Sequence, residues 1–200
     1  MPNINLLFPE VVFSEKLNLN KTELLNNYKQ QNFVKYRGAG EANSFTEISE
    51  NYNVLDEMPS IKNSILKGMN DFANNFLKYK NEFKITTSWF TKTEKNQFSI
   101  MHNHANSMFS AVYYFDNNLN SEIRFEKKSL SMFELAPYEH NDYNSGTITM
   151  SIENETLIIF PSYLPHQVMQ HKDDSVRKSL AVNFLPVGVI GNGNGSASIV

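Results

Sequence analysis

Three histidines are the side chains of this sequence best suited to bind a metal ion. His102 and His104 are two residues apart in the motif HNH, so in an extended strand their imidazoles project from the same face. Two imidazoles on one face at a strand end make half of a metal site. His166, in the motif FPSYLPH, is the best candidate for the other half. This spacing favours a mononuclear iron centre held by His102, His104 and His166 inside a small β-barrel.

The donor set differs from the usual one of non-heme iron oxygenases, which is two histidines and one carboxylate in an H-x-D or H-x-E pattern plus a distant histidine. Here His104 stands where the carboxylate would be. Imidazole is a good ligand for iron, although a third imidazole leaves the metal with one negative charge fewer. A structural zinc site completed by Glu126 or Asp116, and histidines that bind nothing, are alternatives that the spacing leaves open.

A second group of residues, just downstream of His166, could bind a carboxylate. Arg177 and Ser179 are two apart in a predicted strand, so they share a face. Arginine offers a planar fork that matches a carboxylate, and serine adds a hydroxyl donor. Beside a metal, this pair suits the distal carboxylate of 2-oxoglutarate. Away from a metal, Arg177 would be a surface residue of the charged stretch 172–178.

The elements that must position these residues are mainly strands. Between residues 81 and 185, short runs of β-formers with turn signals every eight to twelve residues predict a sandwich or a barrel. Upstream, apolar residues at spacings of three and four predict helices over about 21–31 and 60–79. The apolar stripe of the second helix, from Ile61 to Phe76, should pack on the outside of a sheet. Neither βαβ alternation nor a GxGxxG motif is present, which argues against a nucleotide-binding fold.

The length of 200 residues suits one domain. We expect this domain to span residues 1–185, with helical support in about 1–80 and the β core in about 81–185. Residues 186–200 are rich in glycine and predict a flexible tail without an element of its own.

Composition excludes several classes of function. The net charge is −3 with acids and bases interspersed, which gives no electrostatic reason to expect a nucleic-acid or membrane-surface partner. Cysteine is absent, so disulfides, thiolate metal sites and a cysteine nucleophile are excluded. The sequence has neither a signal-peptide pattern nor an apolar run of the ~20 residues that a membrane span needs, which predicts a cytoplasmic protein.

Taken together, the motifs resemble those of a family of 2-oxoglutarate/Fe(II)-dependent oxygenases of marine bacteria and their phages. The matching motifs are SW (88–89), HNH (102–104), SAVYY (110–114), FPSYLPH (160–166), RKS (177–179) and NF (183–184). The resemblance covers about residues 85–185, and Ala111 stands where the family commonly has glycine. Each motif alone is loose, whereas their joint occurrence in this order is specific.

The resemblance implies a mainly β protein with N-terminal helices (α+β), whose core is a double-stranded β-helix, or jelly roll, with iron at its open mouth. It implies His102 and His166 as metal ligands, with His104 at the carboxylate position. If His104 turned away, water or Asn106 could take its place. Trp89 is expected to line the mouth or to pack in the core.

The resemblance also implies the co-substrate site. Arg177 would anchor 2-oxoglutarate, assisted by Ser179 and by a hydroxyl from Tyr113 or Tyr114. These two tyrosines lie on opposite faces of one strand, so at most one points into the barrel, and we assign Tyr114 to the site. Asn183 is expected to line the mouth.

The implied function is that of a non-heme Fe(II), 2-oxoglutarate-dependent oxygenase, which hydroxylates a substrate that the sequence does not identify and releases succinate and CO2. Three alternatives stay open: a three-histidine, cupin-like dioxygenase without a co-substrate, a non-catalytic metal- or ligand-binding jelly roll, and an accessory protein of a phage or bacterium on this scaffold. A homodimer is also left open, and the cytoplasm could be that of a phage-infected host. Asn103, Gln167 and Ser162 are the candidates to hold the imidazoles through their second nitrogen.

Overall fold

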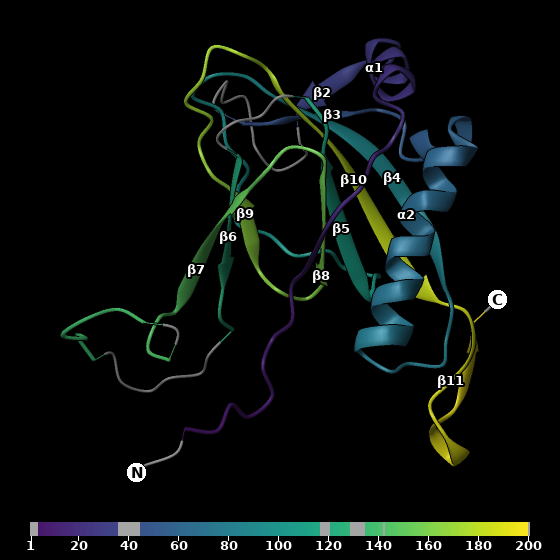
Figure 1. The fold of residues 1–200 in the computed structure, drawn as a ribbon, viewed down its shortest axis with the longest axis vertical. Coiled ribbons are helices and arrows are strands. Elements are labelled where there is room, and N and C mark those ends of the chain that lie inside the picture. Colours follow the sequence, from purple (N-terminus) through teal and green to yellow (C-terminus); the bar gives the residue numbers. More distant parts are fainter. Residues whose placement is uncertain (1–3, 36–44, 117–120, 129–134, 142, 200) are drawn as a thin grey trace.

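The computed structural model describes residues 4–35, 45–116, 121–128, 135–141 and 143–199. Within these residues strands predominate and helices are few (Figure 1). The helical segments are α1 (Lys21–Lys29), a 3-10 turn (Val54–Glu57), α2 (Pro59–Asp71), a π-helical turn (Phe72–Phe76) and a 3-10 turn (Gly193–Gly195). Across the described ranges, no helix has both the length and the apolar character that crossing a membrane requires.

Two antiparallel sheets make the body of the protein. The larger sheet has the order β1 (Phe13–Lys16), β8 (Thr156–Pro161), β5 (Phe109–Tyr114), β10 (Arg177–Pro186), β4 (Phe83–Thr93), β3 (Glu47–Ser49) and β2 (Phe33–Lys35). The smaller sheet has the order β7 (Thr147–Ile152), β6 (Ser121–Glu126) and β9 (His166–Val168). Buried side chains of both sheets form one cluster, so the sheets pack against each other.

Strand alternation divides the larger sheet into two faces. On β10, Leu180 and Phe184 belong to the apolar core on the helix side, whereas Arg177, Ser179 and Ala181 line a cavity between the sheets. The period of two therefore sends every second residue of β10 toward the cavity, as the sequence predicts for Arg177 and Ser179.

Helix α2 covers the face of the larger sheet that points away from the smaller sheet (Figure 1). Its buried stripe includes Ile61, Ile65 and Met69, as predicted. At Gly68 a Cβ atom would lie 3.3 Å from Leu157 Cδ2, so glycine lets the helix approach β8 closely. The α-helix ends at Asp71, and the helical path continues to Phe76, a few residues short of the predicted end near residue 79.

The chain continues from α2 as the π-helical turn, which is wider than an α-turn. Phe72 stacks on Phe13 of β1 with ring centroids 5.0 Å apart, and Phe76 lies 5.4 Å from the same ring. Both phenylalanines of the π-helical turn thus contact the edge strand β1 at the point where the α-helix gives way to the wider turn. Phe76 is nevertheless exposed, unlike the rest of the predicted stripe.

The C-terminal segment differs from the expectation of a tail without secondary structure. Residues 188–199 form a two-stranded hairpin, β11 (Gly188–Ile190) and β12 (Ala197–Ile199). Gly191 and Gly193 adopt positive φ values of 75° and 59° in the connection, a conformation that glycine adopts without steric penalty. The glycines that suggested a flexible tail are therefore the residues that allow the chain to reverse.

Candidate metal site

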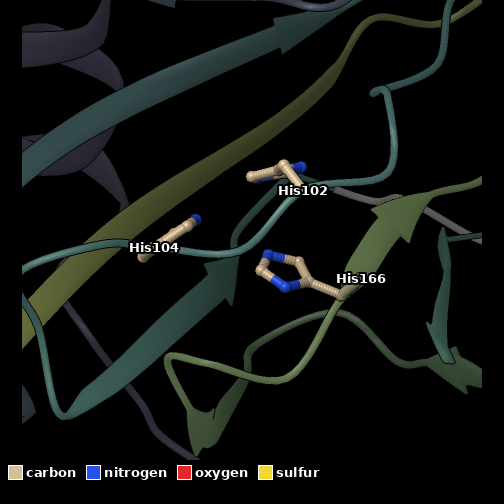
Figure 2. Close-up of side chains that lie close together, drawn as sticks. All are labelled: His102, His104 and His166. Atoms are coloured by element: carbon tan, nitrogen blue, oxygen red, sulfur yellow. The ribbon is translucent and has the colours of Figure 1, made fainter. Parts of the chain in front are cut away.

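The three histidines lie close together (Figure 2), and all three line one cavity. One nitrogen of each imidazole lies within 4.8 Å of those of the other two. The ring centroids are 4.4 Å apart for His102 and His166, 5.1 Å for His104 and His166, and 5.2 Å for His102 and His104. Such a spacing allows one ion to contact all three rings.

Backbone hydrogen bonds hold the two parts of the cluster together. His102 and His166 exchange a pair of bonds: the His102 N–H donates to the His166 carbonyl at 3.0 Å, and the His166 N–H donates to the His102 carbonyl at 2.8 Å. The His104 N–H donates to the Ser162 carbonyl at 2.9 Å. The expectation of a strand end for the HNH motif is wrong in detail, because residues 102–104 form an isolated bridge and an extended segment before β5. The two rings still lie near each other, because the His102 and His104 N–H groups both bond to the 162–166 segment.

Each imidazole has an oxygen atom beside Nδ1. The partners are the Ile100 carbonyl for His102 at 2.8 Å, the Leu164 carbonyl for His166 at 2.9 Å, and the Asn183 Oδ1 for His104 at 2.6 Å. A carbonyl oxygen only accepts, so each Nδ1 carries the hydrogen and each Nε2 carries the ring's lone pair. Three imidazoles in the same tautomer form a donor set that suits Fe, Zn, Ni or Cu.

Burial keeps these rings neutral. Desolvation, together with a smaller effect of the neighbouring His102 and His104, lowers the pKa of His166 from its ordinary value of 6.5 to about 3. Desolvation lowers the pKa of His104 to about 4, with the Asn183 hydrogen bond opposing the shift and His102 adding to it. Desolvation also lowers the pKa of His102. All three rings are therefore available as neutral ligands at physiological pH.

The metal-free protein should lose stability as the pH falls below about 6.5. The folded-state pKa values of His104 and His166 lie below the ordinary value, so the unfolded chain binds more protons in this window. Their contribution is fully present above pH 6.5 and is lost toward pH 4, at up to about 1.4 kcal/mol per pH unit for each ring. Urea unfolding with a chelator at pH 7.5 and 5.5 measures the slope. His166→Gln should reduce it, whereas substitution of the exposed His140 should not; a flat profile would contradict the burial of neutral rings.

Arg177 lies in the same cavity, whose volume is about 420 Å3. Its side chain is only 2% exposed, and its Nη1 donates to the Met169 carbonyl at 3.2 Å. Its Nη2 is buried and has no hydrogen-bond partner among the described residues, and none of their carboxylates forms an ion pair with it. Burial lowers the pKa of this guanidinium. A buried cation without a counter-ion is costly, so this arrangement calls for an anion.

Two hydroxyl groups accompany the guanidinium. The Tyr114 hydroxyl is buried and has no partner within the described ranges, and burial raises its pKa while the Arg177 charge opposes that rise. The Ser179 hydroxyl lies 2.6 Å from Thr91 Oγ1 on the adjacent strand β4. Tyr113 points the other way and donates its hydroxyl to the Leu17 carbonyl, so only one of the two tyrosines faces the space between the sheets. The buried donors of Arg177 and Tyr114 fit a carboxylate ligand.

The structure also identifies contacts that sequence reasoning missed. Asn183 lines the cavity as expected, but it also contacts the His104 ring directly. Ser110, on β5, lies 2.9 Å from the same Nδ1 and was not singled out. Two of the three candidates for holding the imidazoles have other partners: the Ser162 hydroxyl bonds to Ser110, and the Gln167 amide bonds to the Met169 sulfur. The third, Asn103, lines the cavity.

Comparison with known proteins supports the same chemistry. Residues 87–183 match the model of the 2OG-Fe(II) oxygenase family. This segment contains all three histidines, Arg177 and the tyrosine pair. No curated protein matches the chain in sequence.

Solved structures share the fold at low sequence identity. A 2OG-Fe(II) oxygenase family oxidoreductase from Burkholderia pseudomallei has a TM-score of 0.60 at 11% identity, over 82% of this chain and 77% of that one. HygX from Streptomyces hygroscopicus, solved with nickel, 2-oxoglutarate and hygromycin B, has a TM-score of 0.58 at 10% identity, over 88% and 83%. A prolyl-4-hydroxylase from Pseudomonas putida has a TM-score of 0.53 at 14% identity, over 87% and 92%. The family match, read with this fold and the histidine cluster, identifies residues 87–183 as a 2OG-Fe(II) oxygenase domain.

Proposed function

We propose that the three clustered histidines bind Fe(II) through Nε2, and that 2-oxoglutarate binds beside the metal with its distal carboxylate on Arg177, Ser179 and Tyr114. The observation that carries this assignment is the buried Arg177 guanidinium, which lines the same cavity as the histidines and has no carboxylate partner among the described residues. A dicarboxylate would neutralise it and supply acceptors for both unpartnered donors.

The side chains of the site would have three different roles. The histidine rings would fix the metal, and the guanidinium would orient the co-substrate along the cavity. Apolar side chains would pack against the co-substrate's methylene groups and exclude water from them: Val112, Ile123, Val168 and Ala181. Bound Fe(II) with 2-oxoglutarate and O2 supplies the oxidising chemistry, in which one oxygen atom enters succinate as CO2 is released and the other enters a C–H bond of the substrate.

The arrangement of the two sheets supports a double-stranded β-helix, or jelly roll, as the scaffold. In this assignment the larger sheet carries the co-substrate residues on β10 and the smaller sheet contributes His166 at the start of β9. The site would then lie between the sheets, where both can exclude water.

We also propose a particular group of oxygenases to which the chain is related. The order of the HNH, SAVYY, FPSYLPH and RKS motifs supports a place among oxygenases of marine bacteria and their phages, with the cytoplasm as the site of action. The net charge of −3 supports a substrate other than nucleic acid.

The test is turnover of the co-substrate alone. The purified protein, loaded anaerobically with Fe(II) and 2-oxoglutarate, should form succinate on addition of O2, even without its substrate. Omission of iron or O2 should abolish this reaction. Failure to form succinate, with the metal and the co-substrate both shown to be bound, would overturn the proposed activity.

The three-histidine donor set favours a second candidate, a dioxygenase that uses no co-substrate. Arg177 distinguishes the two, because such an enzyme needs no buried cation beside its metal. Isothermal titration with 2-oxoglutarate decides between them: metal-dependent binding supports the first candidate and its absence supports the second.

Removal of the Tyr114 hydroxyl should weaken 2-oxoglutarate binding without destabilising the protein. Loss of one hydrogen bond corresponds to about 1 kcal/mol, or roughly fivefold in affinity. Because this hydroxyl has no protein partner among the described residues, Tyr114→Phe should leave the free energy of unfolding unchanged or raise it. Titration of the metal-loaded protein and urea unfolding of the ligand-free protein measure the two effects.

The neighbouring tyrosine provides a control with the opposite expectation. Tyr113→Phe removes a hydroxyl that donates to the Leu17 carbonyl at 2.7 Å on the other face of the sheet. It should lower stability by about 1 kcal/mol and leave co-substrate binding unchanged. If the two variants behaved alike in the titration, Tyr114 would not belong to the site.

A further inference from the structure

Asn183 connects the His104 ring to the larger sheet. Its Oδ1 lies 2.6 Å from His104 Nδ1, and its Nδ2 donates to Thr87 Oγ1 at 3.0 Å on β4. The Ser110 hydroxyl donates to the same Oδ1 at 2.8 Å from β5, where Ser110 is the direct cross-strand neighbour of Asn183. The amide is thus held by the two strands that flank β10 in the sheet, with its oxygen toward the histidine.

A second serine, Ser162, supports the hydrogen bond from Ser110 to the Asn183 Oδ1. Ser110 is fully buried, and its Oγ lies 2.7 Å from the Oγ of Ser162, which is also fully buried. The Ser162 hydroxyl can donate to Ser110, which leaves the Ser110 hydrogen for Asn183 Oδ1. Ser162 also accepts the His104 backbone N–H through its carbonyl. The network therefore fixes both the main chain and the ring of His104.

The orientation of the amide determines which ring nitrogen can bind a metal. With Oδ1 toward Nδ1, His104 must carry its hydrogen on Nδ1, and its lone pair is on Nε2. If the amide were reversed, its NH2 group would donate to Nδ1, and Nε2 would carry the hydrogen and could not ligate. The structure has the first orientation, in which Nδ2 donates to Thr87 and Oδ1 accepts from Ser110. Since a hydroxyl can donate or accept, these two contacts hold the amide in place, and it is metal binding through Nε2 that requires Oδ1 beside Nδ1.

We propose that Asn183 is a positioning residue that makes His104 a metal ligand, by fixing the tautomer and the plane of its ring. This inference rests on the proposed function, in which the three histidines bind the metal. A carboxylate at position 104 would need no such partner, because both its oxygens can ligate without a choice of tautomer. An imidazole there needs an acceptor beside Nδ1. The Asn183 Oδ1 is the nearer oxygen at 2.6 Å, and the Ser110 Oγ, at 2.9 Å, itself donates to that oxygen.

Metal affinity of the purified full chain tests the proposal, with Co(II) as the probe and its visible absorption as the signal. Asn183→Leu keeps the approximate size but removes the acceptor. It should weaken Co(II) binding about 10- to 100-fold, the usual cost of losing a group that orients a metal-binding histidine. Asn183→Asp keeps an oxygen facing Nδ1 and should bind Co(II) at least as tightly as the unaltered protein, with a similar spectrum. Equal affinities for Asn183→Leu and the unaltered protein would overturn the proposal, as would equal losses in the leucine and aspartate variants.

A double-substitution cycle separates positioning from a general structural effect. If Asn183 acts through His104, then Asn183→Leu should cause no further loss of Co(II) affinity in a His104→Ala background. An undiminished loss in that background would show that Asn183 acts on the fold, and would overturn the proposal. Should the leucine variant not fold, Asn183→Ala gives the same comparison.

The cycle also distinguishes failure of the inference from failure of the proposed metal site. If His104→Ala alone leaves Co(II) affinity unchanged, the three-histidine ligand set is wrong, and the role of Asn183 falls with it. If His104→Ala weakens binding but Asn183→Leu does not, the ligand set stands and only the positioning role is wrong.

Discussion

Replacement of Arg177 with alanine should weaken 2-oxoglutarate binding about 100-fold and leave metal binding unchanged. The guanidinium is buried and carries a donor without a partner among the described residues, so the co-substrate's carboxylate would form a desolvated, charge-assisted pair with it. Truncating one partner of such a pair costs about 2–5 kcal/mol, and 3 kcal/mol corresponds to roughly 100-fold in affinity. Anaerobic titration of the metal-loaded protein with 2-oxoglutarate measures this loss, and a Co(II) titration tests whether the metal site is intact.

Two further variants show whether the effect belongs to the site. Arg124 lies on β6 of the smaller sheet, where its Nε donates to Thr149, and Arg124→Ala should leave both affinities unchanged. Arg177→Met fills the same space without a charge. Because it removes a buried cation that has no carboxylate partner in the described ranges, the ligand-free protein should be as stable as before or more stable. Unchanged co-substrate affinity in both Arg177 variants would refute the assignment of the anchor.

Local pattern was sufficient to predict the residues that share a face. Arg177 and Ser179 are two apart on one strand, so their common orientation follows from the backbone alone. The same holds for the opposite orientations of Tyr113 and Tyr114, and for the HNH motif, whose rings face the same way although the segment is not a strand. These predictions depended only on the spacing of residues along one segment of the chain.

Contacts between distant segments could not be predicted in this way. Asn183 and Ser110 are neighbours because β10 and β5 pair in one particular register, which no single strand specifies. The sequence candidate Ser162 takes part in holding His104, but through Ser110 and through its own carbonyl. Glycine content was misleading in the C-terminal hairpin, because the same residue favours both mobile segments and tight reversals.

Desolvation of the cavity has opposite effects on the stability of the ligand-free protein and on the strength of ligand binding. The buried imidazoles and the Arg177 guanidinium are desolvated, which lowers the stability of the ligand-free protein. The same desolvation strengthens every interaction with a bound ion or carboxylate. The ligand-free protein should therefore gain stability when metal and co-substrate bind, by an amount that grows with their concentrations.

Replacement of His166 with alanine should abolish stoichiometric metal binding. His166 is 3% exposed, starts β9, and is the only one of the three clustered rings that comes from the smaller sheet. Loss of a group outside the ligand set already weakens metal binding about 10- to 100-fold, so loss of a ligand should weaken it by more than about 100-fold. Metal analysis after gel filtration and Co(II) titration measure the effect. The exposed His140 provides the matched control, since His140→Ala should bind one metal ion with unchanged affinity. His102→Ala serves as the second ligand variant if His166→Ala does not fold, and one tightly held ion in either folded variant would mean that the metal site lies elsewhere.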